Sequence, residues 1–282
     1  MPVETIASIA ALRSRRADVR RSGRTVGLVP TMGALHAGHE RLIEQARRES
    51  DCVVVSIFVN PIQFDRQDDL QRYPRTLDAD RAVCERLGVD LIFAPTAEEM
   101  YPEPPQLTVD VGPLGDHLCG PFRPGHFRGV ATVVLKLFEI VQPDRAYFGE
   151  KDAQQLAIIR RLVRDLNVPT AIAGVATVRE ADGLALSSRN QRLSADERRL
   201  ATALFQALRE AERQIGAGER DPAVIRERAA ARIPSSPHLR LEYLEIVDPD
   251  SLQPAAVVQP PVRVAGALWV GSTRLIDNLL IA

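Results

Sequence analysis

The segment TVGLVPTMGALHAGHERLIEQARRES, residues 25–50, joins an apolar run to a helical pattern through a loop that contains glycine and histidine. Residues 25–29 are typical of a short buried strand, and residues 39–50 have apolar side chains at helical spacing. A strand that leads into a helix in this way opens a βαβ unit. The segment therefore predicts an α/β fold, with the loop placed where the strand ends.

The same alternation of strand and helix continues along the chain. CVVVSIFV, residues 52–59, is rich in β-branched residues and is typical of the centre of a parallel sheet. Alternating elements imply right-handed crossovers and a Rossmann-like, doubly wound parallel sheet. The other predicted strands are 90–93, 144–148 and 171–178, and the predicted helices are 6–21, 77–87, 127–141 and 152–166.

The pattern changes after residue 177, so we predict a Rossmann-like catalytic domain at 1–177 and a smaller α+β domain at 178–282. Alternating apolar residues in LRLEYLEIV, 239–247, predict an antiparallel strand in the second domain. The other elements expected there are helices at 194–215 and 221–232 and strands within 262–281. In the first domain, the Pro- and Gly-rich stretch 95–124 predicts a loop with one strand at 107–111.

Composition narrows the class of protein. The chain has 282 residues, is 45% hydrophobic and has a formal net charge of −1, so nucleic acid is not expected as a partner. Three widely separated cysteines form neither a metal-ligand pair nor a disulfide framework, which favours a cytoplasmic location. No apolar run is long enough to span a bilayer, and the N-terminus lacks a secretory pattern, so no membrane association is expected.

Lysine is rare in this chain. Only Lys136 and Lys151 are lysines among 36 basic residues, and all the others are arginine. Lysine is a compact point charge whereas arginine is planar and diffuse, so a lysine here can mark a site where arginine does not fit. Chance is the alternative explanation for either lysine taken alone.

The loop PTMGALHAGH, 30–39, has the features of a nucleotide-binding site. His36 and His39 are three residues apart at a helix start, so they lie on one face and can donate to phosphate oxygens. The helix N-terminus adds N–H donors, Gly33 permits a tight turn, and Gly38 lets a flat base approach the backbone. The alternatives are a surface histidine pair or a metal site, but no cysteine or carboxylate close by completes a metal-ligand set.

Two more polar segments, 60–63 and 149–155, also follow predicted strands. Ligands of an open α/β sheet bind beyond the carboxyl ends of its strands, so we expect these segments to lie at the same edge as the first loop. After Gly149, Lys151 offers a point charge to phosphate and Asp152 can accept from ribose hydroxyls. An exposed charged turn is the alternative.

The loop Leu186-Ser187-Ser188-Arg189 lies near the predicted domain boundary. Its two hydroxyls and its guanidinium suit a phosphate clamp that closes on a bound nucleotide. As an isolated motif it equally predicts a capped turn.

Two glutamines, Gln63 and Gln155, are candidates for binding a small acid. A neutral amide can bind a carboxylate without an ion pair, which would lower the nucleophilicity of that carboxylate. A purely structural role is the alternative for each. Asp80 is a candidate Mg²⁺ ligand, with a solvated helix face as the alternative. Second-rank candidates near the expected cleft are Tyr73, Arg123, His126 and Arg128. Val133 and Val134 belong to an apolar helix that is expected to pack as core, and they are candidates to line the same cleft.

These motifs carry a family resemblance. HAGH after a Rossmann-like first strand resembles the H-x-G-H signature of the nucleotidyltransferase superfamily that includes class I aminoacyl-tRNA synthetases. PTMGALHAGH, FVNPIQF, FGEKDAQQ and GLALSSRN, in that order, resemble the pantothenate synthetase (pantoate–β-alanine ligase) family. H-x-G-H alone indicates only the superfamily, whereas the four strings together are highly specific.

The resemblance implies an ATP- and Mg²⁺-dependent enzyme that activates pantoate as pantoyl-adenylate, joins it to β-alanine and works as a homodimer. It implies that Gln63 and Gln155 bind pantoate, that Gln63 also contacts β-alanine, and that Asp80 binds the metal. The residues implied in catalysis are His36, His39, Lys151, Ser187, Ser188 and Arg189. The residues implied in ATP binding are Met32, Gly33, Ala34, Leu35, His36, Ala37, Gly38, His39, Gly149, Glu150, Lys151, Asp152, Val178, Leu186, Ser187, Ser188 and Arg189.

Two rival functions stay open from the sequence. Another superfamily member would transfer a nucleotidyl group to a phosphorylated substrate, and it would need basic residues in place of Gln63 and Gln155. A non-catalytic regulator would bind ATP without forming AMP. For an adenylate-forming enzyme we expect the second domain to act as a lid that carries the 187–189 clamp and keeps water from the intermediate.

Overall fold

A computed structural model describes residues 3–282 of the chain. The chain divides into two compact units. The first contains the described residues up to Val111, Arg123–Glu150 and Ile158–Ala176, and the second contains Gly112–Phe122, Lys151–Ala157 and Thr177–Ala282. The last division therefore falls beside the predicted boundary at 177. Two short insertions from the first part of the sequence belong to the second unit, which the sequence did not predict.

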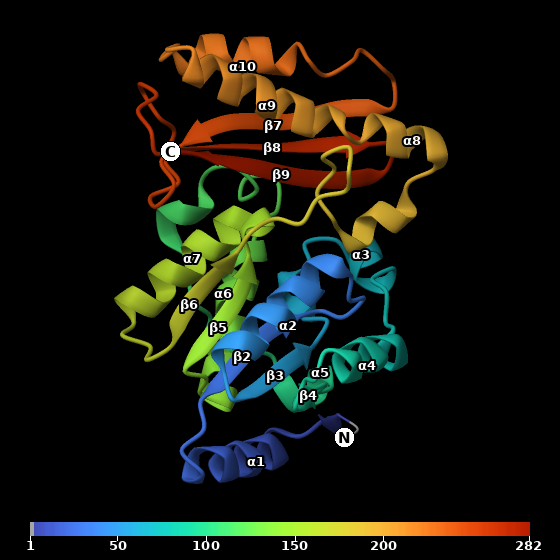
Figure 1. Cartoon of the computed structure of the whole chain (residues 1–282), viewed down its shortest axis with the longest axis vertical. Helices are drawn as coiled ribbons and strands as arrows, with labels where there is room; N and C mark the ends of the chain where they lie inside the picture. The colour runs from blue at the N-terminus through green and yellow to red at the C-terminus, as the bar shows by residue number, and fades with distance from the viewer. Residues whose placement is uncertain (1–2) are drawn as a thin grey trace. The chain divides into compact units, whose positions relative to one another are not determined.

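The first unit is built on a six-stranded parallel sheet with the order β1-β4-β3-β2-β5-β6 (Figure 1). The two central strands β2 and β3 are buried along almost their whole length, which explains their continuous apolar sequences. This arrangement confirms the predicted Rossmann-like fold. The strands are β1 Glu4–Ile6, β2 Val26–Thr31, β3 Cys52–Ile57, β4 Leu91–Phe93, β5 Arg145–Gly149 and β6 Ala171–Val175.

Helices cover both faces of this sheet. α2 (Ala37–Glu49) packs against β2, β3 and β5, where Leu42, Ile43 and Ala46 enter the core. α6 (His126–Val141) precedes β5 on the other side of β2, so a right-handed crossover places it on the face opposite α2. The other helices are α1 Ile9–Arg21, α3 Gln67–Gln71, α4 Leu77–Arg86, α5 Ala97–Met100 and α7 Ala153–Asp165, with 3₁₀ turns η1 Pro61–Gln63, η2 Gly112–Gly115 and η3 Glu150–Asp152.

The second unit is built on a three-stranded antiparallel sheet, β7-β8-β9, with α9 and α10 packed on it (Figure 1). Leu208, Ala211 and Ile215 of α9 and Ile225 of α10 bury their side chains against these strands, forming a separate core. The elements are η4 Ser188–Arg192, α8 Ala195–Leu200, α9 Ala203–Gly216, α10 Pro222–Ala230, β7 Leu239–Val247, β8 Val262–Val270 and β9 Thr273–Ile281.

Three local predictions from sequence were wrong. The first helix begins at Ile9 rather than residue 6, because residues 4–6 pair with β4 as an edge strand. Residues 107–111 form no strand, and the Val109 N–H donates to the Thr132 hydroxyl instead of to a neighbouring strand. The single helix predicted at 194–215 is two helices, α8 and α9.

The helix lengths and the cysteine side chains bear on two of the expectations from sequence. Among the described residues, no helix is long and apolar enough to cross a bilayer. Cys52, Cys84 and Cys119 are buried free thiols. Burial raises the pKa of the Cys52 thiol to about 11, so this thiol is protonated at neutral pH.

An ion-pair cluster around the buried Glu210 side chain joins α9 to the end of α10. The Glu210 carboxylate accepts from Arg213 at 2.6 Å and from Arg232 at 3.0 Å. The hydrogen bond from Arg213 is the main reason that the pKa of Glu210 falls from 4.5 to about 2. Because its pKa is lower in the folded state, Glu210 stabilises the fold above about pH 4.5, and this contribution is lost as the pH falls towards 2.

Glu210→Gln should therefore lower the melting temperature at pH 7, and the gap to the wild type should narrow between pH 4.5 and pH 2. Melting curves recorded across that range measure the effect. Glu212→Gln is the matched control, because Glu212 forms a more exposed pair with Arg209 on the same helix. A gap that stays constant with pH would contradict the assignment.

Candidate active site

Two of the predicted site segments follow the strands at which the direction of strand addition reverses. After β2 the sheet grows through β3 and β4 on one side, and β5 and β6 extend it on the other. The loop 32–36 follows β2, and the turn Glu150–Asp152 follows the neighbouring strand β5. Ligands of open α/β sheets bind beyond the carboxyl ends of the strands at such a switch point. The two segments therefore leave neighbouring parallel strands at the same edge of the sheet, as the sequence predicts.

His36 and His39 form the first turn of α2 and have defined tautomers. The His36 Nδ1 accepts from the Gly38 N–H at 3.1 Å, and the His39 Nδ1 accepts from the His36 N–H at 3.3 Å. A ring nitrogen that accepts has no proton of its own, so each neutral imidazole has its proton on Nε2. The ring centroids are 4.1 Å apart. The sequence therefore builds two neighbouring N–H donors at a helix N-terminus.

Gly33 and Gly38 have different roles in this loop. Gly33 has a φ of +82°, which glycine adopts without strain, as the predicted tight turn requires. A Cβ on Gly38 would lie 2.8 Å from the His36 Cε1 and 3.0 Å from its Nδ1. The missing side chain of Gly38 thus makes room for the His36 ring, a role that the sequence did not predict.

Asp80 holds the histidine loop in place. Its Oδ2 accepts from the Ala34 N–H at 3.0 Å, and its Oδ1 accepts from the Leu35 N–H at 2.7 Å. The Thr76 hydroxyl donates to Oδ2 as well. Asp80 is only 2% exposed, so the solvated helix face considered from sequence is wrong. Ala34 has a φ of +51°, and these hydrogen bonds offset the strain of that conformation.

The same contacts leave Asp80 a poor fit for the predicted metal role. Both carboxylate oxygens accept from the loop, and the side chain is buried away from solvent. Within residues 3–282, no group of three or more His, Cys, Asp or Glu side chains could hold a metal ion. Mg²⁺ usually binds one or two carboxylates together with substrate phosphates, so a resident cage is not needed.

Gln63 lies on the 3₁₀ turn η1, directly after β3. Its Nε2 donates to the Met32 Sδ at 3.2 Å, so the turn contacts the histidine loop. α6 approaches η1 closely at Gly129, where a Cβ would lie 2.4 Å from the Ile62 carbonyl oxygen. Only glycine allows this approach. The sequence therefore fixes Gln63 between the loop after β2 and the start of α6.

A second set of polar contacts holds the backbone of η1. The His126 Nδ1 donates to the Gln63 carbonyl oxygen at 2.8 Å, and its Nε2 lies 3.1 Å from the Arg123 Nη1. Arg123 also pairs with Asp65. Arg123 and His126, second-rank candidates from sequence, thus position η1.

The other second-rank candidates differ in exposure. Tyr73 is buried edge-to-face against Phe64, and Arg128 is exposed. Val133 and Val134 are buried in α6. No contact of these four residues tests their predicted place near the substrate.

The two glutamines of KDAQQ differ in role. Gln154 is buried and bonds the backbone of Leu114, His117 and Cys119, so it holds the insertion 112–122. Gln155, the predicted substrate ligand, is half-buried. A Cβ on Gly149 would meet nothing within 4 Å, which agrees with open space for a ligand.

The predicted clamp residues lie on a hairpin of the second unit. The Leu186 N–H donates to the Val178 carbonyl, and Ser187 caps η4 by accepting from the Arg189 N–H at 3.2 Å. The capped turn considered from sequence is therefore present. The cap uses the Ser187 oxygen as an acceptor, so it does not consume the proton of that hydroxyl. Arg179 anchors the hairpin through two hydrogen bonds to Asp277.

Lys151 belongs to the same unit as this hairpin. Its backbone carbonyl accepts from the Asn278 Nδ2 at 2.9 Å, which fixes the turn that follows β5. Its predicted role towards phosphate, like those of Glu150, Asp152, Ser188 and the loop residue Ala37, is not tested by any contact in the structure.

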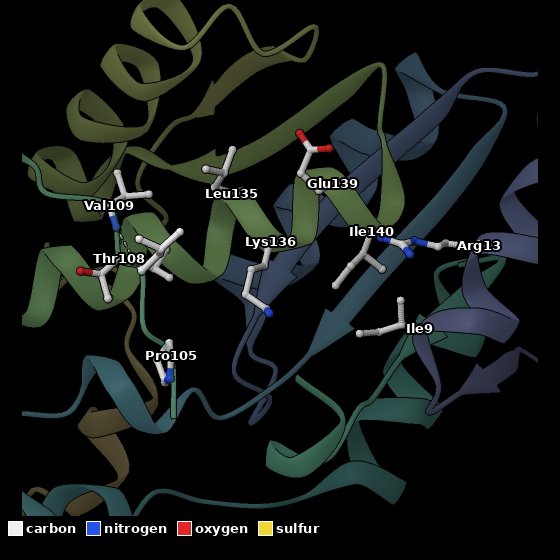
Figure 2. A pocket seen from close by; sticks show the side chains of 11 residues that line it. Ile9, Arg13, Pro105, Thr108, Val109, Leu135, Lys136, Glu139 and Ile140 are labelled. Carbon is white, nitrogen blue, oxygen red and sulfur yellow. Dashed lines mark hydrogen bonds between the residues drawn. The ribbon is translucent and has the colours of Figure 1, made fainter. Parts of the chain in front are cut away.

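A separate pocket of about 470 Å³ lies beside α6, and its lining contains none of the residues predicted to form the site (Figure 2). Its walls come from α1, α6 and the segment 105–109, with Arg13, Lys136 and Glu139 as its charged side chains. The pocket is therefore distinct from the switch point.

Comparison with known proteins identifies the family. The family model described as pantoate-beta-alanine ligase matches residues 4–280, which is nearly the whole chain. The chain belongs to the pantoate–β-alanine ligase family. This confirms the resemblance seen in the four sequence strings.

Curated relatives of this ligase family are similar along almost the whole chain. A pantothenate synthetase from Moorella thermoacetica is 52% identical over 279 residues, covering 99% of each protein. A bifunctional pantoate ligase/cytidylate kinase from Synechococcus elongatus is 56% identical over 274 residues, covering 96% of this chain and 51% of that protein. The chain thus spans about half the length of the bifunctional relatives that it matches.

Solved structures of the pantoate–β-alanine ligase family have the same fold. Pantothenate synthetase from Thermus thermophilus aligns with a TM-score of 0.92 at 48% identity, covering 99% of each chain. The Francisella tularensis ligase, solved in complex with beta-gamma ATP and beta-alanine, aligns with a TM-score of 0.83 at 34% identity, covering 99% of this chain and 97% of that one.

Sequence reasoning missed Asn60, which is 1% exposed and bonds both Gln63 and Tyr101. Its place in the string FVNPIQF, between β3 and η1, was a usable signal. Buried amides need partners, so an Asn and a Gln three residues apart at a strand exit predict a shared network.

Asp80→Asn tests whether this residue holds the loop or binds metal. The asparagine amide would place one of its own N–H groups against a backbone N–H of the loop. We therefore expect a loss of about 1–3 kcal/mol in the free energy of unfolding. Urea denaturation without Mg²⁺ measures this loss. Asp78→Asn, on an exposed position of the same helix, is the control and should change little. Normal stability combined with a raised Mg²⁺ requirement would favour the metal role instead.

Proposed function

We propose that the chain is a pantoate–β-alanine ligase that forms pantothenate through a pantoyl-adenylate intermediate. The observation that carries the proposal is the pair of imidazole N–H donors at the start of α2, with the neutral amide of Gln63 in contact with Met32 of the same loop. Such a site suits a reaction in which a phosphate departs next to a small acid that is bound by an uncharged amide. Family membership and the Francisella ligase complex with beta-gamma ATP and beta-alanine support it.

In the first step, a carboxylate oxygen of pantoate attacks the α-phosphorus of ATP, and the bond to the β-phosphate oxygen breaks. The products are pantoyl-adenylate and pyrophosphate. Negative charge grows on the departing pyrophosphate, so preorganised donors lower the barrier. We assign this task to the Nε2–H groups of His36 and His39, which donate hydrogen bonds to the departing pyrophosphate.

In the second step, the amine of β-alanine attacks the carbonyl carbon of the adenylate. The C–O bond to AMP breaks, and the amine loses a proton as the amide forms. The mixed anhydride makes this attack feasible because AMP is a good leaving group. A free carboxylate would instead have to expel an oxide ion. The protein forms no covalent intermediate and acts by positioning and charge stabilisation.

The remaining roles follow the chemistry of each side chain. We assign ATP binding to residues 32–39, 149–152 and 186–189 and to the Val178 backbone, with Lys151 and the Ser187-Ser188-Arg189 clamp on the phosphates. Gln63 and Gln155 bind pantoate, and Gln63 also contacts β-alanine. Neutral amides at these positions argue against a phosphorylated second substrate, which would require basic residues.

We propose that Mg²⁺ enters with ATP as its phosphate complex, where it neutralises charge on the oxygens. Both oxygens of the buried Asp80 carboxylate accept from backbone N–H groups of the loop, so we assign it no metal contact. No step of the proposed reaction depends on a resident metal ion.

The direct test is to incubate the chain with ATP, Mg²⁺ and pantoate, with and without β-alanine, and to follow the products by mass spectrometry. We expect pantoyl-adenylate and pyrophosphate without β-alanine, and pantothenate and AMP with it. ATP binding without AMP formation would favour a regulator. Nucleotidyl transfer to a phosphorylated acceptor would favour another member of the superfamily.

His36→Ala and His39→Ala should each lower pantoate-dependent ATP–pyrophosphate exchange by about 100-fold or more, the usual cost of removing a donor to a developing charge. Each residue also caps α2, so a loss of about 1 kcal/mol in stability is expected as well and is checked by melting curves. His238→Ala, at an exposed position, is the control. Near-normal exchange in both variants would refute the assignment.

Three further expectations are part of the proposal. A homodimer is expected from the family resemblance and is measured by analytical ultracentrifugation. Closure of residues 178–282 as a lid would reduce the radius of gyration in solution scattering when ATP and pantoate bind. A cytoplasmic location is expected from the three widely separated cysteines, whose spacing suits no disulfide framework, and is checked by cell fractionation.

A further inference from the structure

We propose that Tyr101 is a positioning residue that fixes the orientation of the Gln63 amide through Asn60. The inference rests on the proposed function, because it treats Gln63 as a pantoate ligand. Tyr101 follows α5 and is far from the histidine loop in sequence, yet its hydroxyl donates to the Asn60 Oδ1 at 2.9 Å. Asn60 in turn donates from Nδ2 to the Gln63 Oε1 at 3.0 Å.

The Gly129 carbonyl, which can only accept a hydrogen bond, fixes the orientation of the Asn60 amide. The Asn60 Nδ2 lies 3.2 Å from this carbonyl oxygen. The nitrogen must therefore face Gly129 and Gln63, and the oxygen must face Tyr101. Asn60 is 1% exposed, so no bulk water can replace a lost partner. The Tyr101 hydroxyl is the donor that completes this arrangement.

The orientation of Asn60 determines what Gln63 presents to a substrate. The Gln63 Oε1 is taken by Asn60, so its Nε2 turns to Met32. A thioether sulfur is a weak acceptor, and a carboxylate or hydroxyl oxygen of pantoate would be a stronger one. The network thus makes Gln63 an N–H donor towards the substrate, whereas an unrestrained glutamine could present either end of its amide.

The surroundings of Tyr101 keep its hydroxyl a donor. Burial raises the pKa of Tyr101 well above its ordinary value, so the proton stays on the hydroxyl at all working pH values. The Lys136 Nζ lies 5.1 Å from the centre of the ring, a cation–π distance. A cation over the ring draws electron density from the phenol oxygen and strengthens the bond to Asn60. Lys136 lines the pocket beside α6 (Figure 2), so this rare lysine links the pocket to the amide network.

Tyr101→Phe should raise the KM for pantoate roughly three- to tenfold, the range expected when one net hydrogen bond is lost. The assay is pantoate-dependent ATP–pyrophosphate exchange without β-alanine. The KM for ATP and the maximal exchange rate should change by less than about twofold, because the variant alters only the presentation of Gln63. A merely structural role would instead lower the maximal rate in proportion to folded protein and leave the KM for pantoate unchanged.

Tyr147→Phe is the matched control. Tyr147 is fully buried in β5, and its hydroxyl bonds the Ser50 hydroxyl at 3.1 Å, outside the amide network. It should lose a similar amount of stability and keep the wild-type KM for pantoate. If Tyr101→Phe also keeps that KM, or if both variants raise it equally, the proposal is overturned.

Lys136→Met decides the matter if Tyr101→Phe fails to fold. It keeps the hydroxyl and the aliphatic stem and removes the cation, so it should raise the KM for pantoate roughly two- to fivefold at unchanged KM for ATP. An unchanged KM for pantoate in this variant would then overturn the proposal. If the wild type itself shows no pantoate-dependent exchange, the proposed function fails, whereas wild-type exchange with unaffected variants removes only the role of Tyr101.

Discussion

The buried Asp80 carboxylate is the interaction on which the candidate site depends, because it binds two successive backbone N–H groups of the loop after β2. Those bonds hold a turn that includes the positive φ values of Gly33 and Ala34. The turn in turn sets where α2 begins, and therefore where His36 and His39 stand. A buried carboxylate that accepts from backbone amides is a strong, charge-assisted restraint. Asp80 on α4 therefore controls the geometry of the loop that leads into α2.

Polar groups around η1 likewise restrict the orientations that the Gln63 side chain can adopt. Gly129 lets α6 approach, His126 bonds the backbone of Gln63, and Asn60 bonds its side chain. Each contact leaves fewer orientations for one amide that has no charge to guide it. Such preorganisation favours binding because the ordering is completed during folding and not during association. In the proposed function, a neutral amide at this position would leave the carboxylate of a small acid nucleophilic.

The second unit has its own restraints for the clamp. Arg179 pairs with Asp277 on β9, and the Arg179 guanidinium stacks over the Phe205 ring at 4.4 Å. Gly183 is required because a Cβ there would meet Phe205 at 2.1 Å. The hairpin that carries residues 186–189 is therefore firmly held at its base. In this way the fold places the predicted phosphate donors on a rigid support rather than on an isolated loop.

The sequence by itself determined the parallel sheet, its central strands, the antiparallel C-terminal sheet and the family, because periodicity and contiguous motifs are local properties of the chain. It also identified the segments 30–39 and 149–152 at neighbouring strand exits. Only the tertiary structure revealed the structural roles of Asp80, Gly129, Asn60 and Tyr101, because their partners are distant in sequence. The edge strand at 4–6 and the loop at 107–111 were misjudged for the same reason: a strand exists only where a neighbour offers hydrogen bonds, and a short segment does not specify its neighbour.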